Sequence, residues 1–432
     1  MSGPARAMSF SGADSQQVFV DLPRWGQHLT FPSTRRTSRY THVVGGRYPC
    51  RSIALVPRLI LAAVSHRVSN QLVVLDPFMG SGTTAIEARL ANAETIGLEV
   101  DPYARLVATA STQVYTDEQL FVIERFSESV ERNARKIRGF REFVPQLDNL
   151  DLWFPSTNIR KLAQIRGLIE EEFSKKSKSR GLVLAAFGDI VRAASFAERQ
   201  SLKPYVSRRF PKTPGEPFRL FKSAVATYVA AASEYRKATD QFGPPLRWAK
   251  GDATNFTISK KVDLAITSPP YINAMDYVRC IRLESAWIGT GDSRIFRRVR
   301  EQQVGETLRV AGTNLPEEVE SLVISYSRRI AKLDPQRATI VETYFCDMLR
   351  NIRCVQRALR PGSSYFLIVG DSTIRGLNVP THRILAGLGE SVGMDWSGYF
   401  KYDIRDHRTS IPRKNRGGKI RLEHVIQLTK PR

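Results

Sequence analysis

A short stretch in the second half of the chain combines a hydroxyl, two consecutive prolines and an aromatic ring. The apolar residues 264–266 predict a buried strand, which is followed at once by Thr267-Ser268-Pro269-Pro270-Tyr271. Two prolines fix two φ angles and supply no N–H, so the strand cannot continue through them. They can instead hold a hydroxyl, their carbonyls and a ring rigidly at the carboxyl end of a strand, where open α/β sheets bind ligands. A Pro-Pro turn that only ends a strand is the alternative.

A second polar loop lies earlier, between residues 71 and 102. Residues 72–75 predict a strand, Asp76-Pro77-Phe78-Met79-Gly80-Ser81-Gly82 a tight loop, and Thr83 onward a helix. Glycines let the backbone approach a ligand closely, and the free N–H groups at a helix start favour an anionic group such as a carboxylate. Residues 95–100 predict a second strand, so the pattern indicates a β-α-β unit with a ligand loop at its first turn.

An acidic residue follows this unit at the place where a ribose would lie. Glu99 stands at the end of the second predicted strand, where its carboxylate could accept hydrogen bonds from ribose hydroxyls. The G-x-G-x-x-G spacing of dinucleotide-binding folds is absent, and no Gly-Lys-Ser/Thr follows the loop, which excludes a Walker A motif. A purely structural glycine turn stays an alternative.

Together these motifs resemble the amino-methylating DNA methyltransferases. Asp76 to Thr84 is similar to that family's D-P-F-x-G-S-G-T-T loop for S-adenosylmethionine, and residues 267–271 are similar to its catalytic S-P-P-Y. The segment around His42 and Tyr48 resembles the part that closes over the methionine moiety, although Cys50-Arg51 stands where a small residue and Lys are usual. The resemblance implies cofactor contacts at His42, Tyr48, Asp76, Phe78, Gly80, Ser81, Gly82, Thr83, Thr84, Glu99, Asp252 and Ala253.

The family's reaction suits these residues. An exocyclic base amine is a poor nucleophile, and acceptors on its N–H bonds favour a tetrahedral nitrogen whose lone pair can attack the sulfonium methyl. We expect Ser268 Oγ and the Pro269 carbonyl to be those acceptors, with Pro270 fixing the geometry. The base must leave the duplex, and stacking on Tyr271 would offset part of that cost. Methylation at cytosine C5 would need a thiolate, and the only Pro-Cys pair, at Cys50, lies far upstream.

Ser in the first motif position leans, in this family, to cytosine N4. Adenine N6 is the first alternative, and RNA methyltransferases with similar motifs are the second, although no RNA-binding module is recognisable. A third is a nucleic-acid-binding protein that retains an inactive methyltransferase fold; the intact motifs argue against it. The resemblance also allows a cognate restriction endonuclease as a partner.

The overall charge points to the same class of partner. The 432 residues carry 65 Lys and Arg against 42 Asp and Glu, a formal net charge of +23, which predicts a polyanionic partner, with nucleic acid preferred to a membrane surface. A merely solubilising charge is the alternative. Four separated cysteines predict neither a zinc site nor a disulfide framework. The absence of a signal-like or membrane-spanning stretch predicts a cytoplasmic, DNA-associated protein of bacterial type.

We expect an α/β fold, a doubly wound Rossmann-like methyltransferase sheet with a helical insertion. The predicted organisation is a basic N-terminal tail over 1–39, a cofactor-binding part over 40–115, a mainly helical insertion over 116–246 that could contact DNA, and a catalytic part over 247–432. Within the last part, residues 289–340 predict an irregular Arg-rich insertion followed by a helix near 316–332, and residues 345–359 predict an amphipathic helix.

Overall fold

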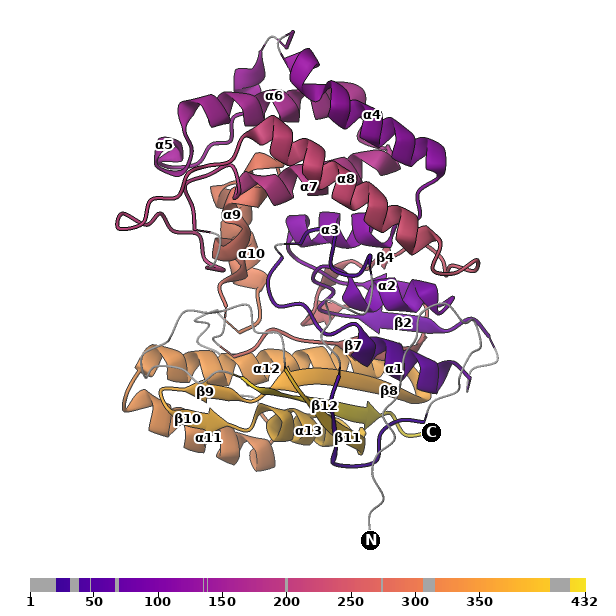
Figure 1. The fold of residues 1–432 in the computed structure, drawn as a ribbon. Helices are drawn as coiled ribbons and strands as arrows, with labels where there is room; N and C mark the ends of the chain where they lie inside the picture. Colours follow the sequence, from indigo (N-terminus) through magenta and orange to yellow (C-terminus); the bar gives the residue numbers. More distant parts are fainter. Residues whose placement is uncertain are drawn as a thin grey trace.

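An eight-stranded sheet forms the centre of the protein in the computed structural model (Figure 1). The structure describes residues 21–31, 39–46, 48–66, 70–134, 136–137, 139–198, 201–272, 275–305, 315–404 and 420–432. In spatial order the strands are β1 (Gln27–Leu29), β11 (Asp395–Asp403), β12 (Leu422–Thr429), β8 (Leu359–Gly370), β7 (Val262–Thr267), β2 (Val73–Asp76), β3 (Glu94–Gly97) and β4 (Arg247–Trp248). Strands β8 to β4 run parallel, and β12 is antiparallel to both of its neighbours.

Helices cover both faces of this sheet because alternate strand residues point to opposite sides. Val74 and Leu264 pack against helix α1 (Leu55–Ser65), whereas Leu75 and Ala265 pack against helix α12 (Pro335–Ala358). The remaining helices of these layers are α2 (Thr83–Leu90), α3 (Pro102–Thr112), α11 (Glu317–Ala331) and α13 (Thr381–Ser391). The predicted doubly wound, Rossmann-like fold is therefore confirmed.

The strand order reverses between β2 and β7. From β2 the chain proceeds outward to β3 and β4, then returns to β7 and continues to β8 on the other side. In open α/β sheets such a switch point leaves a crevice outside the carboxyl ends of the two central strands. The loop after β2 is the predicted cofactor loop, and the loop after β7 carries Ser268. The topology thus brings both motifs to one crevice.

A layer of helices lies beyond α3, above the sheet in Figure 1. It consists of α4 (Asp117–Ala134), the 3₁₀ turn η2 (Phe140–Phe143), α5 (Leu150–Trp153), α6 (Ser156–Glu172), α7 (Lys178–Val191) and α8 (Pro217–Arg236). Its apolar core includes residues of α3 and of α9 (Tyr277–Trp287), such as Val107 and Trp287. The buried ion pair between Arg192 Nε and Glu284 Oε1, 3.1 Å long, also fastens this layer to α9.

Three elements differ from the expectations. Strand β1 lies within the predicted tail, where it pairs in parallel with β11; residues 1–20 and 32–38 of that tail lie outside the described residues. The Arg-rich stretch expected to be irregular contains helix α10 (Ser293–Gln302), since Asp292 Oδ1 accepts from Ile295 N at 2.8 Å and Val299 is buried on one face. Helix α12 begins at Pro335, ten residues before its predicted start, because Asp334 caps it.

Two small hairpins complete the fold, β9 (Ser372–Ile374) with β10 (Leu377–Val379), and β5 (Gly251–Asp252) with β6 (Asn255–Phe256). None of the described helices is long and apolar enough to cross a bilayer.

Candidate active site

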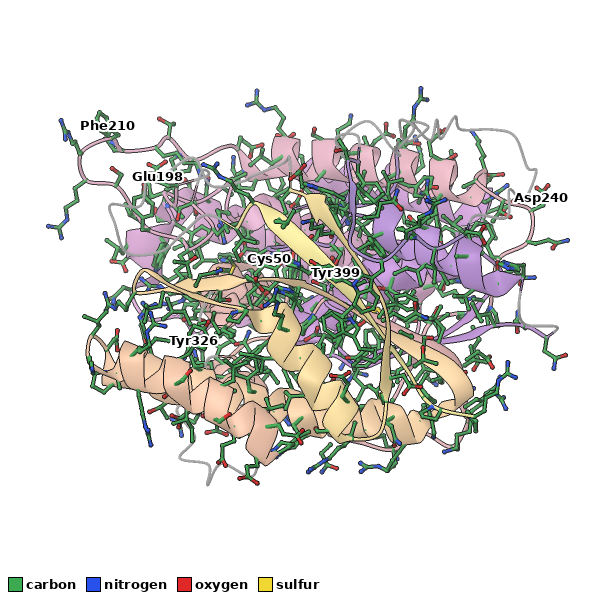
Figure 2. The ribbon with its side chains drawn as sticks, turned by 90° about the horizontal axis from the view of Figure 1, so that it is seen from below. Cys50, Glu198, Phe210, Asp240, Tyr326 and Tyr399 are labelled. Carbon is green, nitrogen blue, oxygen red and sulfur yellow. The ribbon has the colours of Figure 1, made fainter. Side chains whose placement is uncertain are left out.

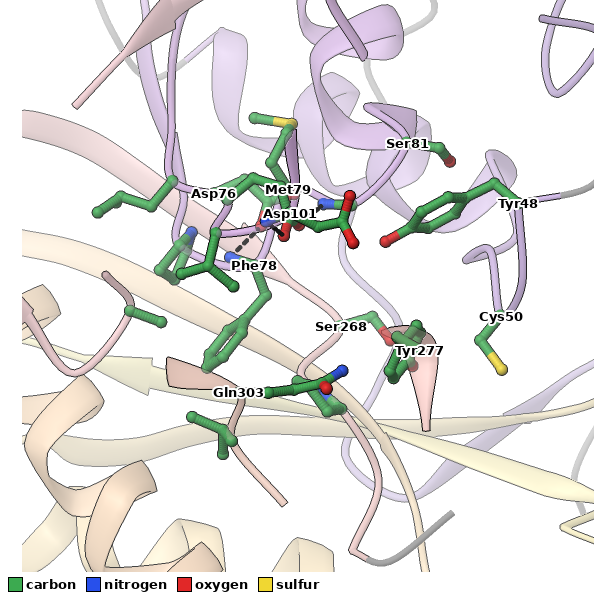
Figure 3. Close-up of a pocket in the computed structure, with 18 of the residues that line it drawn as sticks. Tyr48, Cys50, Asp76, Phe78, Met79, Ser81, Asp101, Ser268, Tyr277 and Gln303 are labelled. Carbon is green, nitrogen blue, oxygen red and sulfur yellow. Dashed lines mark hydrogen bonds between the residues drawn. The ribbon is translucent and has the colours of Figure 1, made fainter. Parts of the chain in front are cut away.

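A pocket opens at the carboxyl ends of β2, β3 and β7 (Figure 3). Its empty space, open mouth included, is about 890 Å³. Most of the predicted site residues line it: Tyr48, Asp76, Phe78, Gly80, Ser81, Thr83, Thr84, Glu99, Ala253, Ser268 and Pro270. His42, Gly82, Asp252, Pro269 and Tyr271 are not among the lining residues.

The glycine loop takes its shape from two residues with positive φ. Gly80 has φ 51° and Gly82 has φ 89°, a region that glycine enters without strain. A Cβ on Gly82, the N-cap of α2, would lie 3.0 Å from Ala108 Cα, so only glycine allows the loop to pack this closely on α3. A Cβ on Gly80 would lie 3.5 Å from the Tyr48 ring, and this narrow space is part of the pocket.

Asp76 joins the two loops. Its carboxylate is 3% exposed, and Oδ1 accepts from Phe78 N at 3.0 Å and from Thr267 Oγ1 at 2.5 Å. Burial raises the pKa of Asp76 to about 6, against the lowering effect of hydrogen bonds from Thr267, Thr84 and Phe78. The residue before Ser268 is therefore tied to the first residue of the cofactor loop.

Glu99 and Asp101 add two carboxylates to the lining of the pocket. Glu99 accepts from Gly80 N at 2.8 Å and Asp101 N at 2.9 Å, and burial raises its pKa to about 7 although its side chain faces the pocket. Asp101 caps α3 by accepting from Tyr103 N at 2.7 Å, and burial raises its pKa to about 6. Two acceptor groups beside a glycine turn fit a ligand with hydroxyl or ammonium donors, as S-adenosylmethionine has.

The segment before α1 forms one wall. Tyr48 lines the pocket, whereas His42 donates to or accepts from Thr83 Oγ1 through Nε2 at 3.0 Å and so braces the start of α2. Arg51, where the resembled family usually has Lys, donates to the carbonyls of His42 at 2.7 Å and Val44 at 3.2 Å. The arginine at this position therefore stabilises the turn formed by residues 40–46.

Ser268 lies within the pocket, and Tyr271 lies beside it. Figure 3 shows Tyr277 at the same opening as Ser268. The Tyr271 hydroxyl instead donates to Glu423 of β12, which also accepts a hydrogen bond from Tyr402 of β11. Burial raises the pKa of Glu423. The ring after the two prolines is thus anchored to strands from the end of the chain.

Sequence reasoning missed Tyr277, Glu423 and Asn351. Asp276 caps helix α9, and Tyr277 is the first residue of that helix. A capping Asp so soon after the motif was a sequence signal for a helix start, and it could have placed Tyr277 near the site. Asn351 is fully buried in α12 and donates from Nδ2 to the Ala253 carbonyl at 2.7 Å. Nothing local in the sequence marks Glu423 or Asn351, because their partners lie far away along the chain.

Asp252 lies at the turn of the β5–β6 hairpin. Its Oδ1 accepts from Thr254 N at 2.8 Å, from Thr254 Oγ1 at 2.7 Å and from Asn255 N at 3.1 Å. These bonds shape the turn that presents Ala253, whose side chain lines the pocket.

One group of potential metal ligands lies at the end of β8. Asp371 Oδ1 lies 2.8 Å from His382 Nδ1, and the rings of His382 and His424 stack in parallel with centroids 3.9 Å apart. Imidazole lone pairs lie in the ring plane, so two parallel rings at this separation do not both point at one ion about 2 Å away. Tyr399 Oη also lies 2.7 Å from His424 Nδ1, which makes the group a hydrogen-bonded cluster.

Residues 25–109, from before β1 into α3, match the model of a family of DNA methylases (N6 and N4 methyltransferases). The matched segment includes the glycine loop and Glu99 and ends before Ser268.

The chain is similar to Type II methyltransferases, over most of its length in one case and over about a third in another. M.MvaI of Kocuria varians is 23% identical over 93% of this chain and 92% of its own length. M.MjaII of Methanocaldococcus jannaschii is 25% identical over 35% of this chain and 29% of its own. A solved structure, the rRNA methyltransferase aviRa from Streptomyces viridochromogenes, aligns with 93% of this chain and 96% of its own at 9% identity, with a TM-score of 0.30. The family match and the fold support a methyltransferase, for which S-adenosylmethionine is the methyl donor.

Proposed function

We propose that this protein is a site-specific DNA methyltransferase that methylates an exocyclic base amine, cytosine N4, on a base turned out of the duplex. The observation that carries the proposal is the shared pocket: Ser268 and Glu99 line it together, and the Thr267–Asp76 hydrogen bond joins the loops that bear them. A methyl donor held at the Glu99 side would face an amine held at the Ser268 side.

The cofactor contacts proposed from the family resemblance agree with the pocket's chemistry. Glu99 supplies carboxylate acceptors for the ribose hydroxyls, and the Gly80 turn lets the backbone approach the ligand. Ala253, fixed by Asn351, lines the side where the adenine would lie, and Tyr48 covers the opposite wall. S-adenosylmethionine supplies an electrophilic methyl group on a sulfonium centre.

On the substrate side, Ser268 Oγ and the Pro269 carbonyl oxygen accept hydrogen bonds from the two N–H groups of the target amine. This makes the nitrogen more tetrahedral and directs its lone pair toward the methyl group. Bound S-adenosylmethionine would supply the methyl group: the amine nitrogen would form the C–N bond as the C–S bond of the donor broke, and the surplus proton would leave to solvent. The contribution of the protein is positioning and fixed dipoles, without a covalent enzyme intermediate.

The Tyr271 ring is the surface on which the target base stacks in this proposal. Its hydroxyl is already bonded to Glu423, so its orientation is set before the base arrives. Stacking of this kind is worth about 1–3 kcal/mol, which offsets part of the few kcal/mol needed to extract a base.

DNA is the proposed partner because basic residues lie next to the pocket. Helix α10 exposes Arg294, Arg297, Arg298 and Arg300, while its Val299 and Gln302 line the pocket. A phosphate backbone held along this helix would bring a neighbouring base to the opening.

Cytosine N4 is preferred to adenine N6 because Ser268 occupies the first position of the S-P-P-Y motif. Adenine N6 is the second candidate, since the matched family includes N6 and N4 methyltransferases. The Type II names of the relatives also favour a modification enzyme with a cognate endonuclease as partner.

The test is incubation with S-adenosylmethionine and PCR-amplified, hence unmodified, bacterial genomic DNA, followed by nucleoside mass spectrometry. N4-methylcytosine is the expected product, and N6-methyladenine would select the second candidate. A parallel reaction with RNA and calorimetry with S-adenosylmethionine complete the design. Methyl transfer to RNA alone, or cofactor binding without transfer to either nucleic acid, would contradict the proposal.

A further inference from the structure

Between α7 and α8 the chain forms an arm, residues 201–212, that extends sideways from the helical layer (Figure 1). Figure 2 shows Phe210 at the outer edge of the molecule, with Glu198 further in. The Phe210 side chain is 70% exposed, more than any other exposed large apolar side chain in the described part of the chain. Tyr205 on the same arm is also exposed. An apolar ring held this far into water suggests a contact surface.

The arm is firmly fixed at its base. Lys212 Nζ donates to three backbone carbonyls, those of Arg192 at 2.7 Å, Ser195 at 2.8 Å and Ala197 at 2.9 Å. Glu198 N donates to the Tyr205 carbonyl at 2.9 Å, next to an antiparallel bridge between Ala197 and Val206. Lys212 therefore stabilises the base of the arm, and the positive charge that the arm presents to solvent comes from other residues.

Two arginines stand directly before the exposed ring. Arg208 and Arg209 are exposed, and in the described residues neither takes part in an ion pair. The Arg209 guanidinium lies 5.3 Å from the Phe210 ring centroid, and Phe210 N donates to Ser207 Oγ at 3.0 Å, which closes a turn at the tip. Guanidinium groups beside a projecting ring complement phosphates beside a base.

The base of the arm is connected to the pocket wall. Arg192 Nη1 donates to the carbonyls of Ser201 at 3.1 Å and Leu202 at 2.9 Å, while its other nitrogens bond to Cys280 and Glu284 of α9. Helix α9 begins with Tyr277, which lines the pocket. One buried arginine therefore fixes the arm relative to the site where the target base would be held.

We propose that the tip Arg208-Arg209-Phe210 is a DNA-contacting element, with the two guanidinium groups on phosphates and the Phe210 ring against a base or sugar of the duplex being methylated. The inference rests on the proposed DNA substrate and adds to it a specific contact surface outside the pocket. A protein partner or an RNA substrate is an outcome that the test distinguishes.

The experiment compares matched variants of the full chain. Phe210→Ala is paired with Phe121→Ala, which removes a ring 62% exposed on α4. Arg208→Gln/Arg209→Gln is paired with Lys175→Gln/Lys176→Gln, the same loss of two charges on the exposed turn between α6 and α7. Binding is measured with a fluorescein-labelled DNA duplex of random sequence across a salt series, and transfer with amplified genomic DNA.

The arginine double variant should reduce the slope of log K against log salt by about 1.8, and its lysine counterpart should change it less. Phe210→Ala should lower kcat/KM for DNA about tenfold with an unchanged Kd for S-adenosylmethionine, and Phe210→Tyr should restore most of the loss. Phe121→Ala should behave as the unaltered protein. Thermal melting checks that the variants remain folded.

The inference is overturned if each variant has the same DNA binding and methyl transfer as its control. It is also overturned if the arm variants weaken binding to the same duplex made of RNA more than binding to the DNA duplex. Methyl transfer that is unaffected by the arm variants contradicts the proposed role of the arm and leaves the proposed function standing. Arm-dependent DNA binding without methyl transfer by the unaltered protein contradicts the proposed function and leaves the arm's role standing.

Discussion

Thr267 Oγ1 and Asp76 Oδ1 are joined by a hydrogen bond of 2.5 Å across the central pair of strands. Because Thr267 precedes Ser268 and Asp76 opens the glycine loop, this bond fixes the distance between the two halves of the proposed site. It is buried, so water cannot take the place of either partner.

Thr267→Val keeps the shape of the side chain and leaves the buried Asp76 carboxylate with one donor fewer. We expect a loss of roughly 1–3 kcal/mol in the free energy of unfolding. Urea denaturation measures it. Thr254→Val, which removes a hydroxyl donor from Asp252 on the partly exposed β5–β6 turn, is the control and should cost less. Equal losses in the free energy of unfolding would mean that the Thr267–Asp76 hydrogen bond stabilises the protein no more than the Thr254–Asp252 bond does.

Ser268→Ala should reduce methyl transfer by about a hundredfold or more, because it removes one of two proposed acceptors on the target amine. The Kd for S-adenosylmethionine should stay nearly unchanged, since Ser268 is proposed to face the substrate. Single-turnover transfer and calorimetry measure the two quantities. A large loss of cofactor affinity would instead place Ser268 on the cofactor side of the pocket.

Glu99 should make S-adenosylmethionine binding pH-dependent near neutrality. Its pKa is about 7, and the ionised carboxylate is the better acceptor for ribose hydroxyls, so the Kd should tighten as the pH rises from about 6 to 8. Glu99→Gln should bind more weakly and lose most of this dependence. An unchanged pH profile in the variant would contradict the ribose role.

The same ionisation affects stability in the absence of cofactor. The pKa of Glu99 is raised from 4.5 to about 7 in the folded protein, so between these values the folded state holds a proton that the unfolded state has lost. Stability should therefore decline as the pH rises through that interval, and Glu99→Gln should remove part of the decline. Denaturation at several pH values serves as a second, ligand-free check.

Tyr271→Phe and Tyr402→Phe are a matched pair of variants, because each removes one hydroxyl group that donates a hydrogen bond to Glu423. Both should lower the melting temperature, as expected for the loss of a hydrogen bond to a buried carboxylate. Only Tyr271→Phe should also lower kcat, by about tenfold, because it frees the ring proposed to stack on the base. Equal effects on kcat would show that Glu423 supports the fold without orienting the base.

The elements around the glycine loop and the Ser268 loop could be predicted because their signals are local. Gly80, Gly82 and the two prolines punctuate apolar runs, so strand, loop and helix follow from neighbouring residues. Strand β1 could not be predicted, since it is three residues long and its pairing partner β11 lies near the other end of the chain. Its stability comes from the sheet that it joins.

The same distinction holds within the site. Asp76 and Glu99 were identifiable because Asp76 is the last residue of β2 and Glu99 follows the end of β3 by two residues. Glu423 and Asn351 act through partners that are distant in sequence, and a carboxylate in a strand or an amide in a helix carries no mark of such a partner. Helix α10 was missed because four exposed arginines outweigh its narrow apolar stripe of Ile295, Phe296 and Val299.

The segment that walls the pocket is held by the helical layer as well as by its own turn, since the Gly45 backbone N–H donates to the Tyr228 hydroxyl of α8 at 2.7 Å. This contact bears on the construction of chimaeras. If residues 116–246 were exchanged with the equivalent region of a relative to change site preference, the graft would also replace the anchor of the cofactor wall. A hybrid that transfers the 40–46 turn together with α8 should retain cofactor affinity better than one that transfers the helices alone.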